Sequence, residues 1–240
     1  MSPPLIETRG LSKHFGGVQA VRDVDFSLAE GELRCLIGPN GAGKSTFFKL
    51  LTGQIKPSSG SVLFRGKDIT ALEAHEIARL GIGIKTQVPS VFNGLTVRDN
   101  LWIAAARHNR RRAVAAAVDA QIERLSLGDI ADKPTSQLAH GQRQWVELGI
   151  VLCGAPRLIL LDEPAAGMTA DETVRTAEII RDINRTLPLI VVEHDMAFIR
   201  MIARRITVFD RGVILSEGDA DTVFRDQAVR DVYLGKQVAA

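Results

Sequence analysis

The sequence predicts an α/β fold with a mostly parallel sheet, a smaller antiparallel β layer and an inserted helical subdomain. Buried strands are predicted at 33–37, which leads into a glycine-rich turn, and at three continuous apolar runs suited to a sheet covered on both faces, which are 158–161, 189–192 and 206–209. Three stretches with a weaker apolar pattern predict half-buried strands of the antiparallel layer, and these are 5–15, 21–28 and 61–65. Helical stretches alternate with the buried runs, and this alternation favours a parallel sheet.

The central part of the chain predicts helices instead of strands. Helical periodicity dominates three stretches there, and these are 97–107, 111–125 and 141–152. We therefore expect residues 1–87 and 156–240 to form one α/β core, into which a helical subdomain at 88–155 is inserted. One further amphipathic helix is predicted at 222–234.

The composition is that of a globular chain without a strongly charged partner. Of its 240 residues 45% are hydrophobic, and 30 Lys and Arg against 28 Asp and Glu leave a net charge of +2. This balance does not favour a nucleic acid partner. Cys35 and Cys153 form no CxxC pair and lie in apolar surroundings, so we expect both in the core. The sequence has no evident leader and no apolar run of ~18 residues, so we expect a cytoplasmic protein that reaches a membrane only through a partner.

The strongest motif follows the first buried run. Residues 38–46 match GxxxxGK[ST] between a predicted strand and a predicted helix, which is the context that a phosphate-binding loop (P-loop) requires. The candidate nucleotide-binding residues of this loop are Gly38, Pro39, Asn40, Gly41, Ala42, Gly43, Lys44, Ser45 and Thr46. The glycines allow a tight turn whose N–H groups point at phosphate oxygens, and the following helix adds its positive end. We expect Lys44 to reach the β and γ phosphates of ATP and Ser45 to bind Mg²⁺.

Two adjacent carboxylates end the second buried run. Asp162 and Glu163 follow 158–161, and we expect no opposite charge near them, so this arrangement favours a metal ion. We expect Asp162 to hold Mg²⁺ and Glu163 to act as general base toward the attacking water. Such a strand end is common by itself, but together with the P-loop it predicts an ATPase.

These motifs, with three further segments, resemble the ATP-binding subunits of ABC transporters over nearly the whole chain. The resemblance implies a RecA-like P-loop ATPase core in which Phe15 stacks on adenine. It also implies that Gln87 contacts Mg²⁺ and the attacking water, and that His194 contacts the γ-phosphate. Each residue has a structural alternative, because Phe15 and His194 could be core side chains and Gln87 an ordinary polar residue at a strand end.

The segment 138–142 stands where the family has its signature motif, which faces the P-loop of a second ATPase chain. Its candidate nucleotide-binding residues are Ala139, His140, Gly141 and Gln142. The resemblance implies that two chains bind two ATP molecules head to tail, with Gly141 and the following helix donating N–H groups to the partner's γ-phosphate.

Three residues depart from the family's usual pattern. Ala139 stands where a serine usually contacts the phosphate, His140 replaces a glycine, and Thr169 replaces an aspartate. Loss of one hydrogen bond to a charged group costs about 1.5–3 kcal/mol at most, so the opposite ATP site would be weakened rather than abolished. We therefore expect the second chain to be a different ATPase instead of a copy of this one.

Four segments narrow the resemblance to ATPases of bacterial importers for branched-chain amino acids, urea and short-chain amides. These segments are 138–145, 162–169, 192–196 and 232–235. The subgroup implies two membrane permeases, an indirect link to a substrate-binding protein, and a peripheral place at the cytoplasmic face of the inner membrane. Residues 90–101 also resemble the ATPase of lipopolysaccharide export, which stays an alternative, as does a soluble ABC ATPase that serves no transporter.

The helical subdomain is the part that the resemblance assigns to the permease. ATP-driven closure of the two chains would move it, and hydrolysis by water activated by Glu163 would release the closure. Phe92 and Trp102 are candidates for permease contacts, with burial in the core as the equal alternative for both.

Overall fold

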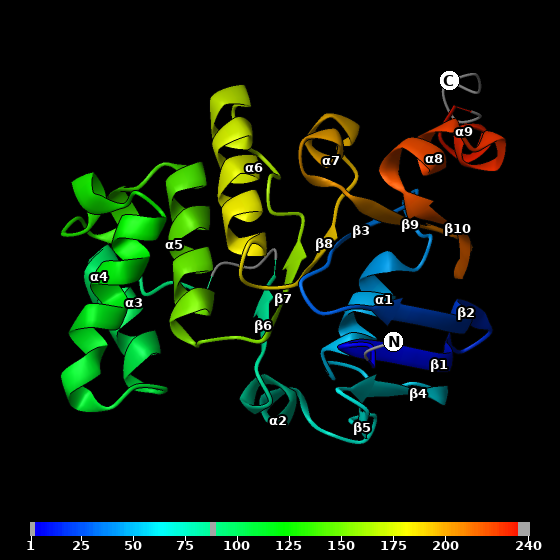
Figure 1. Cartoon of the computed structure of the whole chain (residues 1–240), viewed down its shortest axis with the longest axis horizontal. Helices are drawn as coiled ribbons and strands as arrows, with labels where there is room; N and C mark the ends of the chain where they lie inside the picture. Colours follow the sequence, from blue (N-terminus) through cyan, green and yellow to red (C-terminus); the bar gives the residue numbers. More distant parts are fainter. Residues whose placement is uncertain (1–2, 87–89, 235–240) are drawn as a thin grey trace.

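The computed structural model describes residues 3–86 and 90–234, and Figure 1 shows how their elements are arranged. In this part of the chain the larger sheet has six strands, in the order β10-β9-β3-β8-β7-β6. The strands are β3 (Leu33–Ile37), β6 (Ile82–Lys85), β7 (Leu158–Asp162), β8 (Leu189–Val192), β9 (Arg205–Asp210) and β10 (Val213–Asp219). Neighbouring strands from β9 to β6 are parallel, while β10 pairs antiparallel with β9 at one edge. The four predicted buried strands therefore form the centre of a mostly parallel sheet.

A second, antiparallel sheet has the strand order β2-β1-β4-β5 among the described residues. Its strands are β1 (Ile6–Phe15), β2 (Val18–Leu28), β4 (Ser59–Phe64) and β5 (Lys67–Asp68). The predicted α/β class with an antiparallel layer is thus confirmed.

The helices of the described residues surround these sheets. They are α1 (Lys44–Leu51), α2 (Ala74–Arg79), α3 (Val97–Ala106), α4 (Val114–Arg124), α5 (His140–Cys153), α6 (Ala170–Asn184), α7 (Met196–Ile202), α8 (Ala220–Arg225) and α9 (Gln227–Leu234). Helices α3, α4 and α5, drawn in green in Figure 1, form one end of the molecule, and α6 lies beside α5. A side-chain hydrogen bond joins α5 to α6: the Trp145 indole N–H donates to the Thr176 hydroxyl at 2.9 Å.

Burial on both faces explains the continuous apolar strands. Cys35 and Leu36 are adjacent in β3, yet they belong to two apolar clusters on opposite faces of the sheet. The cluster between the two sheets includes α1, whose Phe47 ring centroid lies 5.4 Å from that of Phe26 in β2 and 5.1 Å from that of Phe209 in β9. The helix that follows the P-loop is therefore fixed by aromatic packing against both sheets.

One predicted helix is wrong. The stretch 222–234 is not a single helix, because α8 ends before Asp226 and α9 starts after it. Asp226 has an extended backbone, with φ −62° and ψ 123°, and its carboxylate accepts a hydrogen bond from the Ala228 N–H at 2.9 Å. A capping aspartate thus breaks an amphipathic pattern that would otherwise predict a single helix.

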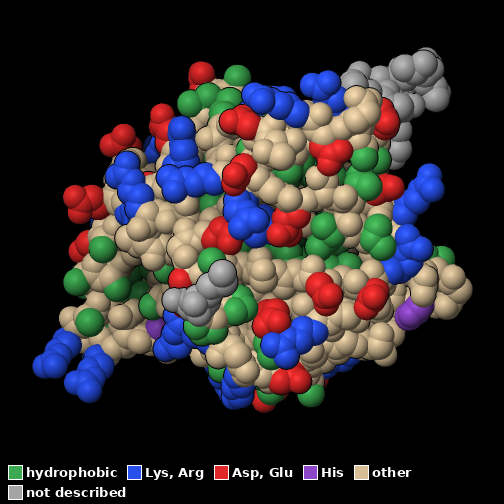
Figure 2. Space-filling view, turned by 45° about the vertical axis from the view of Figure 1, so that its right-hand side comes forward, with side chains coloured by type: hydrophobic (Ala, Val, Ile, Leu, Met, Phe, Trp, Pro, Cys, Tyr) green, Lys and Arg blue, Asp and Glu red, His purple; other side chains and the backbone are tan. Residues whose placement is uncertain are grey.

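The surface and the cysteines agree with a globular chain. Cys35 and Cys153 are both buried free thiols, as predicted. Figure 2 shows Lys and Arg interspersed with Asp and Glu on the face drawn, without a uniformly basic stripe. Across residues 3–86 and 90–234, the structure contains no helix with the length and apolar character needed to cross a bilayer.

Candidate active site

The turn between β3 and α1 is the predicted P-loop, and two of its glycines pack closely against neighbouring backbone. A β-carbon on Gly38 would lie 2.2 Å from the Phe209 carbonyl oxygen, and one on Gly43 would lie 2.4 Å from the Ala20 carbonyl oxygen. Gly43 also has a φ of 104°, a conformation that residues with side chains rarely adopt. A β-carbon on Gly41 would meet nothing within 4 Å. The turn is therefore wedged against β2 and β9, and it is open at Gly41.

The start of α1 leaves backbone donors available to a ligand. Gly43 is its N-cap, no side chain caps it, and no acidic residue lies in its first turn. The first N–H groups of a helix lack partners within the helix, and together with the helix dipole they favour a phosphate. Among the loop residues Asn40 and Ser45 are exposed, Pro39 and Thr46 are half-buried, and Ala42 is buried. The loop thus fits the phosphates of ATP.

The Lys44 side chain folds back over the turn. It is 8% exposed, and its Nζ donates to the Gly38 carbonyl oxygen at 2.5 Å and to the Pro39 carbonyl oxygen at 3.0 Å. Hydrogen bonds from an ammonium to phosphate are stronger than those to neutral carbonyls. The ammonium is therefore held against the loop, where it can exchange carbonyl oxygens for phosphate oxygens.

Phe15 lies at the end of β1, on the hairpin that contacts the P-loop. Its side chain is 50% exposed, and the Lys13 ammonium lies 5.2 Å from the ring centroid. It pairs with Val18, two residues before Ala20, whose carbonyl oxygen abuts Gly43. The core alternative for Phe15 is therefore wrong, and an exposed ring next to the loop is available for stacking.

The acidic pair lies at the end of β7, beside the end of β8. The Glu163 N–H donates to the Val192 carbonyl oxygen at 2.9 Å, and Glu163 has an unusual positive φ of 48°. Burial, and then the neighbouring Glu163 carboxylate, raise the pKa of Asp162. The Nδ1 atom of His194 lies 3.2 Å from the Glu163 carboxylate, and the His194 side chain is 57% exposed, so its core alternative is wrong. The structure therefore brings these three predicted residues together.

Glu193 is a residue of this site that sequence reasoning missed. Its side chain is 2% exposed, and one carboxylate oxygen accepts hydrogen bonds from the N–H groups of His194 at 2.9 Å and Asp195 at 3.3 Å. The other oxygen accepts from the Ala165 N–H at 3.3 Å. Glu193 thus fixes the backbone that carries His194 and the turn that follows Glu163. The only sequence signal was an acidic residue at the end of an apolar strand.

Lys85 contradicts the expectation that no basic group lies near the acidic pair. It ends β6, which pairs with β7 so that Lys85 stands opposite Leu161, one residue before Asp162. Its side chain is buried, and its Nζ lies 3.9 Å from a carboxylate oxygen of Glu147 in α5. The sequence could not indicate this neighbour, because the two strands are far apart along the chain.

The signature segment forms the N-terminal turn of α5. Ala139 is the N-cap and provides no side-chain acceptor, and the Gln142 carboxamide oxygen accepts from the Ala139 N–H at 3.1 Å. His140 Nε2 lies 3.0 Å from the Ala166 carbonyl oxygen, in the turn after the acidic pair. Hydrogen bonds from Thr169 lower the pKa of Glu172, and the nearby Gly141 N–H contributes a smaller effect in the same direction.

The signature helix and the P-loop helix lie in separate parts of this chain. Figure 1 places α5 beside α6, with the strands β7 and β8 between them and α1. Thr169, where many relatives have an aspartate, is the N-cap of α6, and its hydroxyl accepts from the Glu172 N–H at 3.3 Å. The predicted signature segment therefore lies apart from the P-loop within the described residues.

The residues present fit Mg²⁺ bound mainly through phosphates and water. The described part of the chain contains no group of three or more His, Cys, Asp or Glu placed to hold a metal. Its oxygen donors are the exposed Ser45 hydroxyl and the Asp162 carboxylate, which match the few protein ligands that Mg²⁺ usually takes beside a nucleotide. Gln87, predicted as a further ligand, lies outside the described residues.

Comparison with known proteins agrees with this geometry. Residues 21–166 match the family described as ABC transporter. The chain is 34% identical over 254 residues to the high-affinity branched-chain amino acid transport ATP-binding protein LivG of Escherichia coli (strain K12), covering 98% of this chain and 100% of LivG. It is also 34% identical over 242 residues to the lipopolysaccharide export system ATP-binding protein LptB of Acidithiobacillus ferridurans, covering 97% of this chain and 98% of LptB.

Solved structures give the same result for the fold. An ATP-binding cassette of an ABC transporter, solved in its ADP conformation, superimposes with a TM-score of 0.88 at 28% identity. The superposition covers 97% of this chain and 99% of that one.

Proposed function

This chain belongs to the ABC transporter family of ATP-binding proteins, and on that premise we propose that it powers an importer of branched-chain amino acids or of related amides or urea. The proposal rests on one observation, which is that the P-loop, Asp162, Glu163 and His194 occur together. We call these residues the hydrolytic half-site. It combines the P-loop after β3 with Asp162 and Glu163 at the end of β7, and His194 Nδ1 lies 3.2 Å from the Glu163 carboxylate; this combination supports ATP hydrolysis. A similarity to LivG along the whole of both chains supports the choice of importer.

The half-site performs hydrolysis through its own residues as follows. The N–H groups of the P-loop and the Lys44 ammonium bind the phosphates and orient the γ-phosphate. The Glu163 carboxylate accepts the proton of a water whose oxygen attacks that phosphorus, and ADP leaves. His194, held by its contact with Glu163, contacts the γ-phosphate. Ser45 and Asp162, with the predicted Gln87, would hold Mg²⁺, which would supply positive charge to the phosphate oxygens.

A second ATPase chain completes the site head to tail. The N-terminal turn of α5 lies in a separate part of the molecule from α1, so it is free to face the P-loop of the partner. Ala139 offers no hydroxyl and the Gly141 N–H interacts with Glu172, so the donated half is weaker than usual. This asymmetry favours a partner that is a different ATPase.

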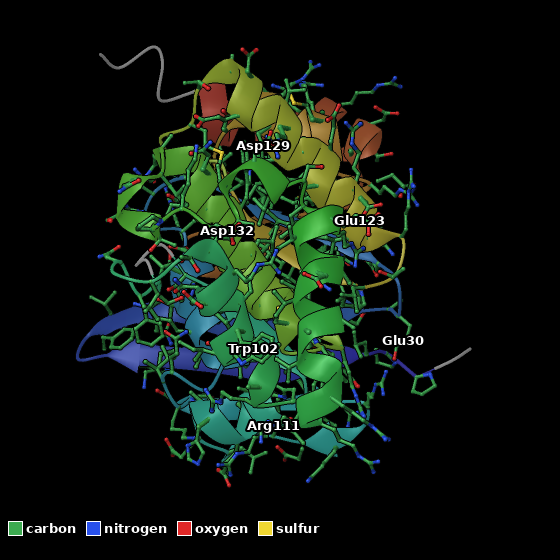
Figure 3. All side chains as sticks on the ribbon, turned by 90° about the vertical axis from the view of Figure 1, so that its left-hand side faces the viewer. Glu30, Trp102, Arg111, Glu123, Asp129 and Asp132 are labelled. Carbon is green, nitrogen blue, oxygen red and sulfur yellow. The ribbon has the colours of Figure 1, made fainter. Side chains whose placement is uncertain are left out.

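The permease binds the helical subdomain, which we take as 88–155 beside a core of 1–87 and 156–240. Phe92 and Trp102 are 57% and 43% exposed, so the core alternative is wrong for both. Figure 3 looks onto this end of the molecule, with Trp102 of α3 in view. The Phe92 backbone is fixed, because the buried Asn100 side chain accepts from its N–H at 2.8 Å and donates to its carbonyl oxygen at 3.2 Å. A fixed backbone that presents an exposed aromatic ring suits a docking contact.

A groove that neither Phe92 nor Trp102 lines fits the same role. It has a volume of about 300 Å³ and lies between β6, α3 and α5. Its lining includes Ile82, Ile84, Ala104, Ile150 and Val151. Two permeases would each seat a short segment in such a groove, which places the chain at the cytoplasmic face of the inner membrane. A substrate-binding protein would act only through the permeases.

Lipopolysaccharide export is the second candidate, because LptB matches at the same 34% identity over nearly the whole chain. The two candidates differ in their membrane partners. We would purify the affinity-tagged chain from detergent-solubilised membranes and identify the accompanying proteins by mass spectrometry. Two permeases encoded with a substrate-binding protein support import, whereas permeases accompanied by periplasmic bridge components support export. Absence of any membrane partner contradicts both and favours a soluble ABC ATPase.

A further inference from the structure

Lys85 and Glu147 form a buried ion pair between the sheet and the signature helix. Their side chains are 3% and 2% exposed, and Nζ lies 3.9 Å from Oε2. Within the described residues, neither Lys85 Nζ nor Glu147 Oε1 has a hydrogen-bond partner. Burying two charges is costly unless they compensate each other, so each strongly requires the presence of the other.

The Lys85 ammonium also interacts electrostatically with the acidic end of the neighbouring strands. Besides Glu147, the carboxylates of Asp162 and Glu193 act on it electrostatically. Burial lowers the pKa of Lys85, and these three carboxylates oppose that shift. One buried ammonium thus interacts electrostatically with a carboxylate of the signature helix and with two carboxylates near the ends of β7 and β8.

Glu147 contacts the chain on both sides of residues 87–89. Its carboxylate pairs with Lys85 on one side and accepts a hydrogen bond from the Ser90 N–H on the other. The same side chain therefore fixes the end of β6 and the start of the helical subdomain relative to α5. A rotation of α5 against β6 would separate the charges and leave both buried without compensation.

We propose that Lys85 and Glu147 are a positioning pair that holds the signature helix in the one orientation that also aligns the Asp162 and Glu163 end of β7. The inference rests on the proposed ATPase function and goes beyond it, because it assigns communication between the two halves of the site to two residues outside the motifs. Neither residue touches the nucleotide. Their effect is on the hydrolytic step rather than on ATP binding.

The test compares variants of the purified complex by their melting temperature, ATP affinity and kcat. Glu147→Gln keeps the shape and an acceptor for the Ser90 N–H, and Lys85→Met keeps the length of the side chain without its charge. Each is expected to lower kcat about tenfold, with ATP affinity within about twofold of wild type. The double variant is expected to lose no more than either single variant, because the two residues act as one unit.

A matched control is the Arg124–Asp182 ion pair, which joins α4 to α6 with 2.9 Å between Nε and Oδ2. Asp182→Asn removes the charge from this contact without touching Lys85, while the Arg124 bond to the Asp182 carbonyl oxygen remains, and it is expected to leave kcat unchanged. A single variant left with one buried charge is the form most prone to unfold, so the uncharged double variant provides the measurement on a stable protein.

Four outcomes overturn the proposal. A lower melting temperature with unchanged kcat makes the pair merely structural, and additive losses in the double variant make the two residues independent. A wild-type complex that hydrolyses no ATP overturns the proposed function together with the pair, whereas an active wild type with equally active variants overturns the pair alone.

Discussion

The imidazole Nδ1 of His194 lies 3.2 Å from a carboxylate oxygen of Glu163. The two residues follow neighbouring parallel strands, and the Glu163 N–H donates to the carbonyl oxygen of Val192, two residues before His194. The buried Glu193 carboxylate fixes the backbone of His194 from the other side. The proposed general base is therefore oriented by a histidine whose own position is set by backbone hydrogen bonds.

Replacing this histidine tests its role in the hydrolytic step. His194→Ala removes the contact with Glu163 but leaves the P-loop donors in place, so we expect kcat to fall about 100-fold while ATP affinity changes little. The measurement is phosphate release by the purified complex, beside fluorescent-nucleotide titration. A kcat within twofold of wild type would show that His194 has no part in the step.

The P-loop makes a separate prediction about Gly43. In Gly43→Ala a β-carbon would lie 2.4 Å from the Ala20 carbonyl oxygen at a φ of 104°, so the loop must shift. We expect ATP affinity to fall at least tenfold, because the N–H groups lose their alignment on the phosphates. Gly66→Ala is the control, since Gly66 has a φ of 75° with nothing within 4 Å of the added carbon. Equal ATP affinity in the two variants would contradict the prediction.

Replacing the exposed aromatic residues of the helical subdomain is expected to weaken binding to the permeases without lowering the stability of the chain. Phe92→Ala and Trp102→Ala remove side chains that are 57% and 43% exposed, so the melting temperature is expected to change by no more than about 2 °C. Retention of the permeases on the tagged chain is expected to fall at least tenfold, since aromatic contacts dominate interface energies. If the variants retain the permeases but melt at a lower temperature, both residues stabilise the fold and do not contact the permeases.

Because both cysteines are buried, we expect the native protein to react slowly with thiol reagents. Burial raises the pKa of Cys153 to about 11, and it raises the pKa of Cys35 still further. At pH 8 roughly one Cys153 in a thousand is then the reactive thiolate, and the fraction rises only as the pH approaches 11. We expect no labelling by iodoacetamide in the native state at pH 8 and two labels per chain in urea. Rapid native labelling would show that one of the thiols is accessible.

The local motifs were predictable because each of them consists of residues that are consecutive or closely spaced in the sequence. The P-loop needs glycines and Lys44 at fixed spacing after a buried strand, and the structure places them as predicted. Glu163 and His194 were predicted from strand ends, and the parallel sheet brings them together. Periodicity also predicted the antiparallel layer and the helices at 97–107 and 141–152 to within a few residues.

The features that sequence reasoning missed depend on contacts across the fold. Lys85 belongs to β6, a four-residue strand whose two isoleucines, separated by a glycine, gave too weak a signal for an element of its own. Its partner Glu147 lies on a helix where a buried acid is indistinguishable from a solvent-facing one. The break at Asp226 depends on one capping hydrogen bond, and periodicity does not detect such a bond.

The central claim is that Glu163 of this chain serves as the base for ATP hydrolysis in a site that a second chain completes. The most direct test is ATP hydrolysis and ATP retention by the complex carrying Glu163→Gln. We expect at least a 100-fold loss of phosphate release, with ATP bound as tightly as in wild type and the two ATPase chains trapped together. Phosphate release at the wild-type rate would contradict the claim.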